Sequence, residues 1–104
     1  MATNFETVKE ETRRYAAEVR RHLPVDKAYL FGSYAKGTAD ELSDVDVAFF
    51  LRDYSGKTRF DVGLQLVKLC RSFNANFKPL VFESAEIERN NPFVNEIINT
   101  GFEL

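Results

Sequence analysis

The chain has 104 residues, 44% of them apolar, which is enough for one hydrophobic core and too few for two. Its 14 basic and 16 acidic residues leave a net charge of -2, so a general attraction to nucleic acid is excluded and any phosphate affinity must be local. The single cysteine excludes an internal disulfide, and the sequence has neither a signal-like segment nor an apolar run of bilayer length. We therefore expect a single domain over residues 1–104, cytoplasmic and without a membrane span.

The first two predicted elements are a helix and a strand. Apolar side chains recur at steps of three and four over residues 4–23, with charged residues between them. This spacing predicts an amphipathic helix, and we expect its N-cap at Asn4 or Thr3. The short apolar segment 27–31 runs into Gly32, a pattern typical of a buried strand that ends in a turn.

The middle of the chain predicts strand, helix and strand. Residues 44–51 are β-branched and aromatic, which favours a central strand that is covered on both faces beyond Asp46. Segment 60–73 has apolar residues at helical spacing, and segment 77–83 is again typical of a strand. Pro79 cannot donate a hydrogen bond to a neighbouring strand, so it predicts an edge strand or a bulge.

The C-terminal part predicts three short elements. We expect a helical turn at residues 84–88, a helix over 92–100 with Gly101 just past its end, and a short strand in 102–104. The fold class expected from this order is α+β (α/β), a small mixed β-sheet with helices packed on it.

A glycine and serine stand where the first strand meets a short predicted helix. Gly32 has no Cβ, which lets a phosphate approach the backbone. Ser33 begins the helix, so its hydroxyl and the free N–H groups of the first turn attract an anion. We therefore predict that Gly32 and Ser33 bind a β- or γ-phosphate. Lys36 is either a further phosphate contact or a solvated helix lysine.

Two aspartates open the predicted central strand. Residues i and i+2 of a strand share a face, so Asp44 and Asp46 point together. Mg²⁺ is usually bound by one or two carboxylates together with waters and substrate phosphates, so this pair suits a magnesium and nucleoside triphosphate complex. The predicted chemistry is attack of a hydroxyl on the α-phosphorus with pyrophosphate leaving, and the predicted metal-binding and catalytic residues are Asp44 and Asp46.

The Gly32-Ser33 pair, ten intervening residues, and Asp44-Val45-Asp46 together resemble the signature of the DNA polymerase β-like nucleotidyltransferase superfamily. The small size is similar to its minimal, stand-alone branch. The resemblance implies a polymerase β palm-like fold, Mg²⁺ as cofactor and ATP as substrate. Members of this branch are often encoded beside a small helical HEPN-type protein and act as its antitoxin. Some transfer AMP to a tyrosine of that partner.

The family carries a third carboxylate on the strand that corresponds to residues 77–83. Here its place falls on Lys78, or alternatively on Asn76, and neither side chain binds Mg²⁺ as a carboxylate does. Asp40 and Glu41 precede the aspartate pair in the chain. On geometric grounds, they are candidates to replace the missing third carboxylate.

Two functions therefore stay open at this point: a nucleotidyltransferase, or a catalytically degenerate nucleotide-binding antitoxin module that docks on a partner. A polymerase that extends nucleic acid is disfavoured because the sequence has no basic stripe to hold a strand. The sequence does not decide whether the chain forms a homo-oligomer.

Overall fold

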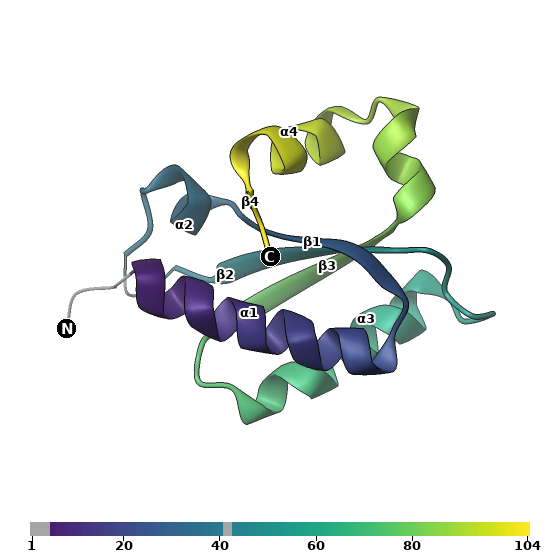
Figure 1. Cartoon of the computed structure of the whole chain (residues 1–104), viewed down its shortest axis with the longest axis horizontal. Coiled ribbons are helices and arrows are strands. Elements are labelled where there is room, and N and C mark those ends of the chain that lie inside the picture. Colours follow the sequence, from purple (N-terminus) through teal and green to yellow (C-terminus); the bar gives the residue numbers. More distant parts are fainter. Residues whose placement is uncertain (1–4, 41–42) are drawn as a thin grey trace.

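The computed structural model describes residues 5–40 and 43–104, so the N-cap predicted at Asn4 or Thr3 lies outside the described residues. Four strands form one sheet, and helices pack on both of its faces (Figure 1). The helices are α1 (Phe5–His22), α2 (Ser33–Lys36), α3 (Arg59–Leu69) and α4 (Pro92–Thr100), with 3₁₀ segments η1 (Cys70–Ser72) and η2 (Ser84–Arg89). The strands are β1 (Val25–Phe31), β2 (Val45–Leu51), β3 (Phe77–Glu83) and β4 (Phe102–Glu103).

The sheet is mixed, as predicted, and has the order β3-β2-β1-β4. Strand β2 pairs antiparallel with β1 and parallel with β3, while β4 adds an antiparallel edge to β1. The edge position expected from Pro79 is confirmed, because β3 forms one border of the sheet and Pro79 lies opposite Val47. The fold class predicted from the sequence is therefore correct.

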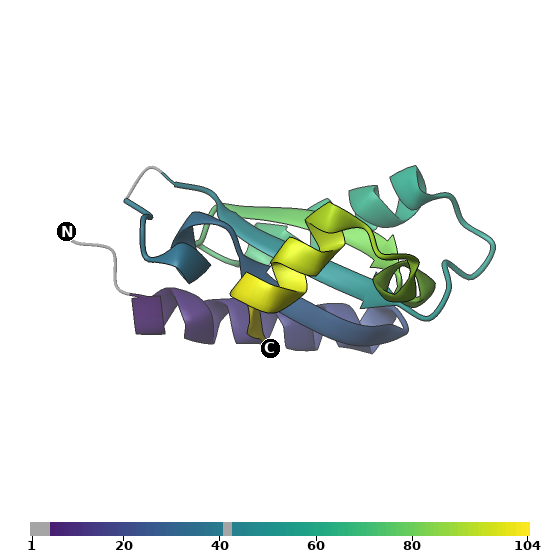
Figure 2. The ribbon, with the colours of Figure 1, turned by 90° about the horizontal axis from the view of Figure 1, so that it is seen from above.

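Different helices cover the two faces of the sheet. Alternate residues of β2 point to opposite faces, so Val47 and Phe49 join the core cluster with α1 and α3. Ala48 and Phe50 join the cluster with α4 instead. Figure 1 shows α1 and α3 on one side of the strands and α4 on the other, and Figure 2 shows α4 crossing the strands diagonally. Strand β2 is thus covered on both faces, as its composition predicts.

Several predicted boundaries differ from the structure. Strand β2 begins at Val45 rather than at residue 44, so Asp44 lies just before the strand. Strand β1 begins at Val25 rather than at residue 27, because an irregularity in register between Val25 and Lys27 lets Val25 pair with Leu51. The helix predicted over 60–73 is α3, which ends at Leu69 and tightens into the 3₁₀ segment η1. No helix among residues 5–40 and 43–104 has the length and apolar character needed to cross a membrane.

Candidate phosphate and metal site

The sheet topology brings three chain segments together at one end. Because β1 and β2 are antiparallel, the end of β1 meets the start of β2, and Phe31 lies opposite Asp46. Because β2 and β3 are parallel, the start of β3 lies at the same end, and Asp46 lies opposite Lys78. The turn after β1, both aspartates and Lys78 therefore share one end of the sheet, on the α4 side.

Gly32 forms the turn between β1 and α2. Its φ of 75° and ψ of −148° fall in a region that residues with a side chain rarely adopt. A Cβ on Gly32 would lie 2.2 Å from Oδ2 of Asp46. The carboxylate of Asp46 is thus packed against the backbone of the glycine, and the predicted phosphate turn and predicted metal ligand are direct neighbours. Ser33 follows as the first residue of α2 and is partly exposed.

Asp46 lies in β2 on the face opposite the buried Val45 and Val47, and Asp44 directly precedes the first residue of the strand. Asp44 is exposed and its Oδ1 accepts a hydrogen bond from Nδ2 of Asn76 at 2.5 Å. Asp46 is half-buried, and this burial raises the pKa of its carboxyl. The Lys78 ammonium opposes the rise in the Asp46 pKa, and the Asp44 carboxylate adds to it. Both neighbours are therefore close enough to influence the Asp46 charge.

The position expected for a third carboxylate carries a cation. Lys78, on which the place of the third carboxylate falls in the sequence, is exposed and lies directly across from Asp46. The backbone and carboxylate of Asp40 form hydrogen bonds with Ser43 in the loop before β2, and Glu41 lies outside the described residues. Within the described ranges, no three His, Cys, Asp or Glu side chains are grouped so that they could hold a metal ion.

The family model for the nucleotidyltransferase domain matches residues 12–98, which include the turn, both aspartates and Lys78. The chain belongs to the nucleotidyltransferase domain family. This match confirms the family predicted from the Gly-Ser and Asp-X-Asp spacing.

Three solved structures have a fold similar to this nucleotidyltransferase. A protein from Sulfolobus solfataricus assigned as a nucleotidyltransferase is 23% identical, with a TM-score of 0.62 over 77% of this chain and 70% of that chain. A mutant of the toxin–antitoxin MntA–HpeT is 23% identical, with a TM-score of 0.57 over 89% and 70% of the two chains. A toxin–antitoxin with AMP-PNP is 20% identical, with a TM-score of 0.52 over 97% and 72%. Among curated proteins, none matches the chain.

The donor set of this nucleotidyltransferase fits one magnesium ion rather than two. Asp44 and Asp46 would supply two neighbouring carboxylates, and phosphate oxygens and waters are the usual remaining ligands of Mg²⁺. A second ion would need the carboxylate whose place Lys78 takes. The two aspartates would thus suit a single magnesium ion, with the positive charge of Lys78 beside them.

Two neighbours of the site could not be foreseen from the local sequence. Nζ of Lys36 donates to Oε1 of Glu96 at 3.0 Å, so the predicted phosphate contact of Lys36 competes with an ion pair to α4. These two residues are 60 positions apart, and only the packing of α4 on the sheet joins them. Asn76 is the second: its side chain donates to Asp44, whereas the sequence indicates it only as an alternative position for the third acid.

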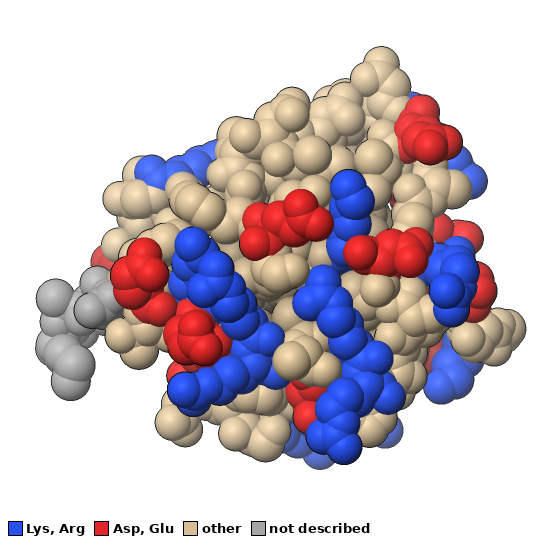
Figure 3. Space-filling model, viewed as in Figure 1, with Lys and Arg blue, Asp and Glu red and all other residues tan. Residues whose placement is uncertain are grey.

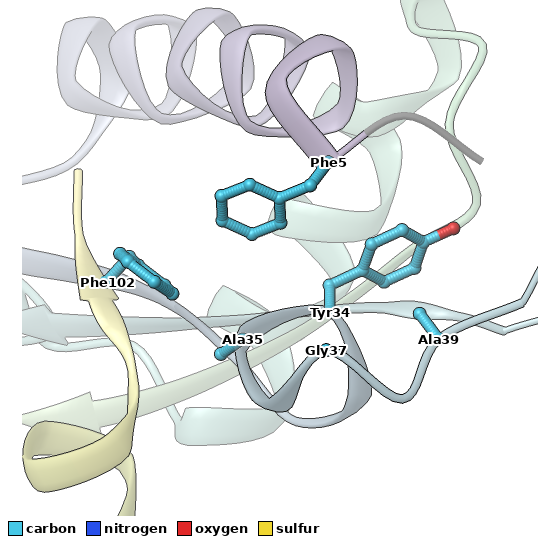
Figure 4. Close-up of a pocket in the computed structure, with 6 residues that line it drawn as sticks. All are labelled: Phe5, Tyr34, Ala35, Gly37, Ala39 and Phe102. Atoms are coloured by element: carbon cyan, nitrogen blue, oxygen red, sulfur yellow. The ribbon is translucent and has the colours of Figure 1, made fainter.

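A second, apolar hollow of about 320 Å³ adjoins α2. Figure 4 shows Phe5, Tyr34 and Phe102 around it, and the rings of Phe5 and Phe102 pack against each other with their centroids 5.1 Å apart. The residues of α2 that line it, Tyr34 and Ala35, differ from those at the phosphate turn. This hollow is therefore separate from the candidate site.

Proposed function

We propose that this nucleotidyltransferase binds a magnesium nucleoside triphosphate at Gly32, Ser33, Asp44 and Asp46 and transfers its nucleoside monophosphate to a hydroxyl. The nucleotide is ATP and the transferred group AMP. The observation that carries the proposal is the contact between the Asp46 carboxylate and the Gly32 backbone. Because of this contact, a triphosphate on the turn has its phosphates beside the aspartate pair.

Each residue has a distinct role in the proposed reaction. The backbone of Gly32 and the hydroxyl of Ser33 bind the outer phosphates and thereby orient the triphosphate. Asp44 and Asp46 would hold Mg²⁺, which when bound neutralises charge on the phosphate oxygens. The acceptor oxygen forms a bond to the α-phosphorus, the bond from that phosphorus to pyrophosphate breaks, and the hydroxyl proton passes to solvent or to a nearby base.

We propose a tyrosine hydroxyl on a HEPN-type helical partner protein as the acceptor. The support is that two structures with a similar fold are toxin–antitoxin proteins, one of them with AMP-PNP. A second support is an unpartnered apolar stripe on α3. Phe60 is 72% exposed, Leu64 45% and Val67 47%, and these positions share one helix face. Lys57, Asp61 and Lys68 lie around Leu64, so basic residues are in excess beside the stripe, which favours a partner helix with more acidic than basic residues beside its apolar face.

Replacing Leu64 with glutamate tests this surface. We expect the partner affinity to fall about 10-fold or more, because a charge would be buried at the centre of the interface. Nucleotide affinity should stay unchanged, since α3 covers the sheet face opposite the aspartates. Calorimetric titration with the partner measures the effect. The control is Ala17→Glu, which adds the same charge at an exposed position of α1; equal losses in both variants would contradict the proposed surface.

The transfer reaction is tested by incubating the protein with Mg²⁺, ATP labelled in its α-phosphate and the partner encoded beside it. The proposal predicts label on the partner and release of unlabelled pyrophosphate. Label that stays in ATP, with a wild-type protein that still binds the partner, would overturn the proposed transfer.

A second candidate function is a degenerate nucleotide-binding antitoxin module that acts by docking alone. The observation that favours it is Lys78, which stands across from Asp46 where the family carries its third acid. In the transferase, the same ammonium would contribute positive charge beside the phosphates, in place of a second metal ion.

Replacing Lys78 separates these two candidates. With Lys78→Gln we expect ATP affinity to fall about 10-fold, since a hydrogen bond to a charged group contributes roughly 1.5–3 kcal/mol. Lys27→Gln, an exposed lysine at the far end of β1, is the control and should change nothing. The decisive variant is Lys78→Glu, which restores a carboxylate at this position. If Lys78→Glu transfers label and the wild type does not, the wild type lacks only the third acid for transfer, and the degenerate module is its correct function.

The charge distribution does not favour a nucleic acid as the acceptor. On the face shown in Figure 3, Lys and Arg form two separate bands over the lower half, with Asp and Glu beside and above them, and the bands do not join into one continuous stripe. A strand of nucleic acid is held by a continuous basic track, so a protein acceptor suits this surface better.

A further inference from the structure

A small cavity lies beside the phosphate turn, between α2 and α4. Its volume is about 120 Å³, and its lining includes Phe31, Gly32 and Lys36 from one side and Phe93, Glu96 and Thr100 from the other. Gly32 therefore belongs both to the phosphate turn and to this cavity. Phe31 lies opposite Asp46 in the sheet, so the cavity also adjoins the aspartate pair.

Phe93 offers an aromatic surface at the border of this cavity. Its side chain is 45% exposed, although its ring centroid lies only 6.0 Å from that of Phe31 and 6.2 Å from that of Phe82. The Asn91 cap and Pro92 fix the start of α4 just before it, because the Asn91 side chain accepts a hydrogen bond from the Phe93 N–H. Phe93 is thus an exposed ring on a well-defined backbone, with other rings packed beside it.

Three polar side chains line the cavity: Lys36, Glu96 and Thr100. Glu96 and Lys36 form an ion pair at 3.0 Å whose side chains are both about half exposed, at 53% and 49%. The carboxylate can accept from an amino group, and the ammonium can donate to a ring nitrogen. The Thr100 hydroxyl already donates to the backbone oxygen of Glu96 at 2.7 Å, which leaves it as an acceptor.

We propose that this cavity binds the nucleobase of the nucleotide, with the base stacked on Phe93 and its exocyclic amino group donating to Glu96. The inference rests on the proposed function, because it takes the phosphates to lie at Gly32. It adds a recognition site for the base, which neither the Gly-Ser turn nor the aspartates supply. The donor and acceptor pattern favours a purine with an amino group over uracil.

The test compares binding of ATP, UTP and inorganic tripolyphosphate, each with Mg²⁺, by calorimetric titration. Tripolyphosphate carries the phosphates without a base, so it reports on the phosphate site alone. The wild type should bind ATP more tightly than either of the others. Stacking of one base on an aromatic side chain corresponds to a loss of roughly 5- to 160-fold on alanine substitution, so Phe93→Ala should weaken ATP binding by that factor and leave tripolyphosphate binding unchanged.

Matched variants make the result specific. Phe93→Leu keeps an apolar side chain but removes the ring, and should weaken ATP binding as Phe93→Ala does, while Phe93→Tyr should restore it. Phe102→Ala removes a similarly exposed ring, 39% exposed, that does not line the cavity, and should change nothing. Glu96→Ala should reduce the preference for ATP over UTP.

The outcomes separate this inference from the proposed function. If the wild type binds neither ATP nor tripolyphosphate, the proposed function fails. If tripolyphosphate binds as tightly as ATP, or if the Phe93 variants weaken both ligands equally, the phosphate site stands and the nucleobase site is wrong.

Discussion

Gly32→Ala is expected to abolish nucleotide binding and to lower the free energy of unfolding. Two effects combine at this position. An alanine at φ 75° and ψ −148° costs roughly 1–3 kcal/mol in backbone strain. Its Cβ would also lie 2.2 Å from Oδ2 of Asp46, so the carboxylate or the turn must move. Either movement separates the phosphate turn from the aspartate that we propose as a magnesium ligand.

Gly56→Ala provides the control for backbone strain alone. Gly56 has a similar φ of 78°, and a Cβ there would meet nothing within 4 Å. We expect it to lower the free energy of unfolding by about 1–2 kcal/mol, the cost of a left-handed residue with a side chain, without changing nucleotide affinity. Urea unfolding and titration with ATP measure both quantities. Equal losses of stability in the two variants, with ATP binding intact in Gly32→Ala, would contradict the close packing of Asp46 on the turn.

Asp46→Asn is expected to remove magnesium-dependent nucleotide binding and transfer. Asparagine keeps the shape that packs against Gly32 but replaces a charged carboxylate by a neutral amide, which is a weaker ligand for a hard cation. Removal of a residue that only supports a metal ligand typically lowers metal affinity ~10–100-fold. Asp46 would bind the ion directly, so we expect the Mg²⁺-stimulated affinity for ATP to fall by about 100-fold or more. The fold should persist, since Asp46 is only half-buried.

The matched control for this charge change is Glu88→Gln. Glu88 is an exposed carboxylate in η2, which follows the end of β3 that is remote from the aspartates. It should leave ATP affinity and its dependence on Mg²⁺ unchanged. ATP binding by Asp46→Asn that is as tight as in the wild type and still requires Mg²⁺ would show that the ion is held elsewhere.

The site was predictable where it depends on local sequence. The i, i+2 spacing predicted that Asp44 and Asp46 share one face of a strand. In the structure β2 begins at Val45, so Asp44 directly precedes the strand, although it is close enough to Asp46 to raise the pKa of that carboxyl. The apolar run that follows them predicted a strand buried on both faces, and β2 is such a strand. The distance between the Gly-Ser turn and Asp46 was not predictable from spacing alone, because it depends on the antiparallel register of Phe31 with Asp46.

The cavity beside the turn could not be predicted, because its parts meet only through tertiary packing. Lys36 and Glu96 are far apart in sequence, and helical periodicity does not indicate that α4 packs over the end of β1. Phe93 follows a proline and was interpreted as the start of a helix, with nothing in its neighbourhood to suggest an exposed ring at a binding site. Boundaries were missed for a similar reason, since the irregular register that extends β1 to Val25 arises from pairing with β2.

The most direct test is a crystal structure of the protein with a non-hydrolysable ATP analogue and Mn²⁺, which replaces Mg²⁺ and can be located by its anomalous signal. We predict outer phosphates on the backbone of Gly32 and Ser33 and an Mn²⁺ peak bound by carboxylate oxygens of both Asp44 and Asp46. A nucleotide away from the Gly32 turn, or an Mn²⁺ ion that contacts neither aspartate, would contradict the proposed site.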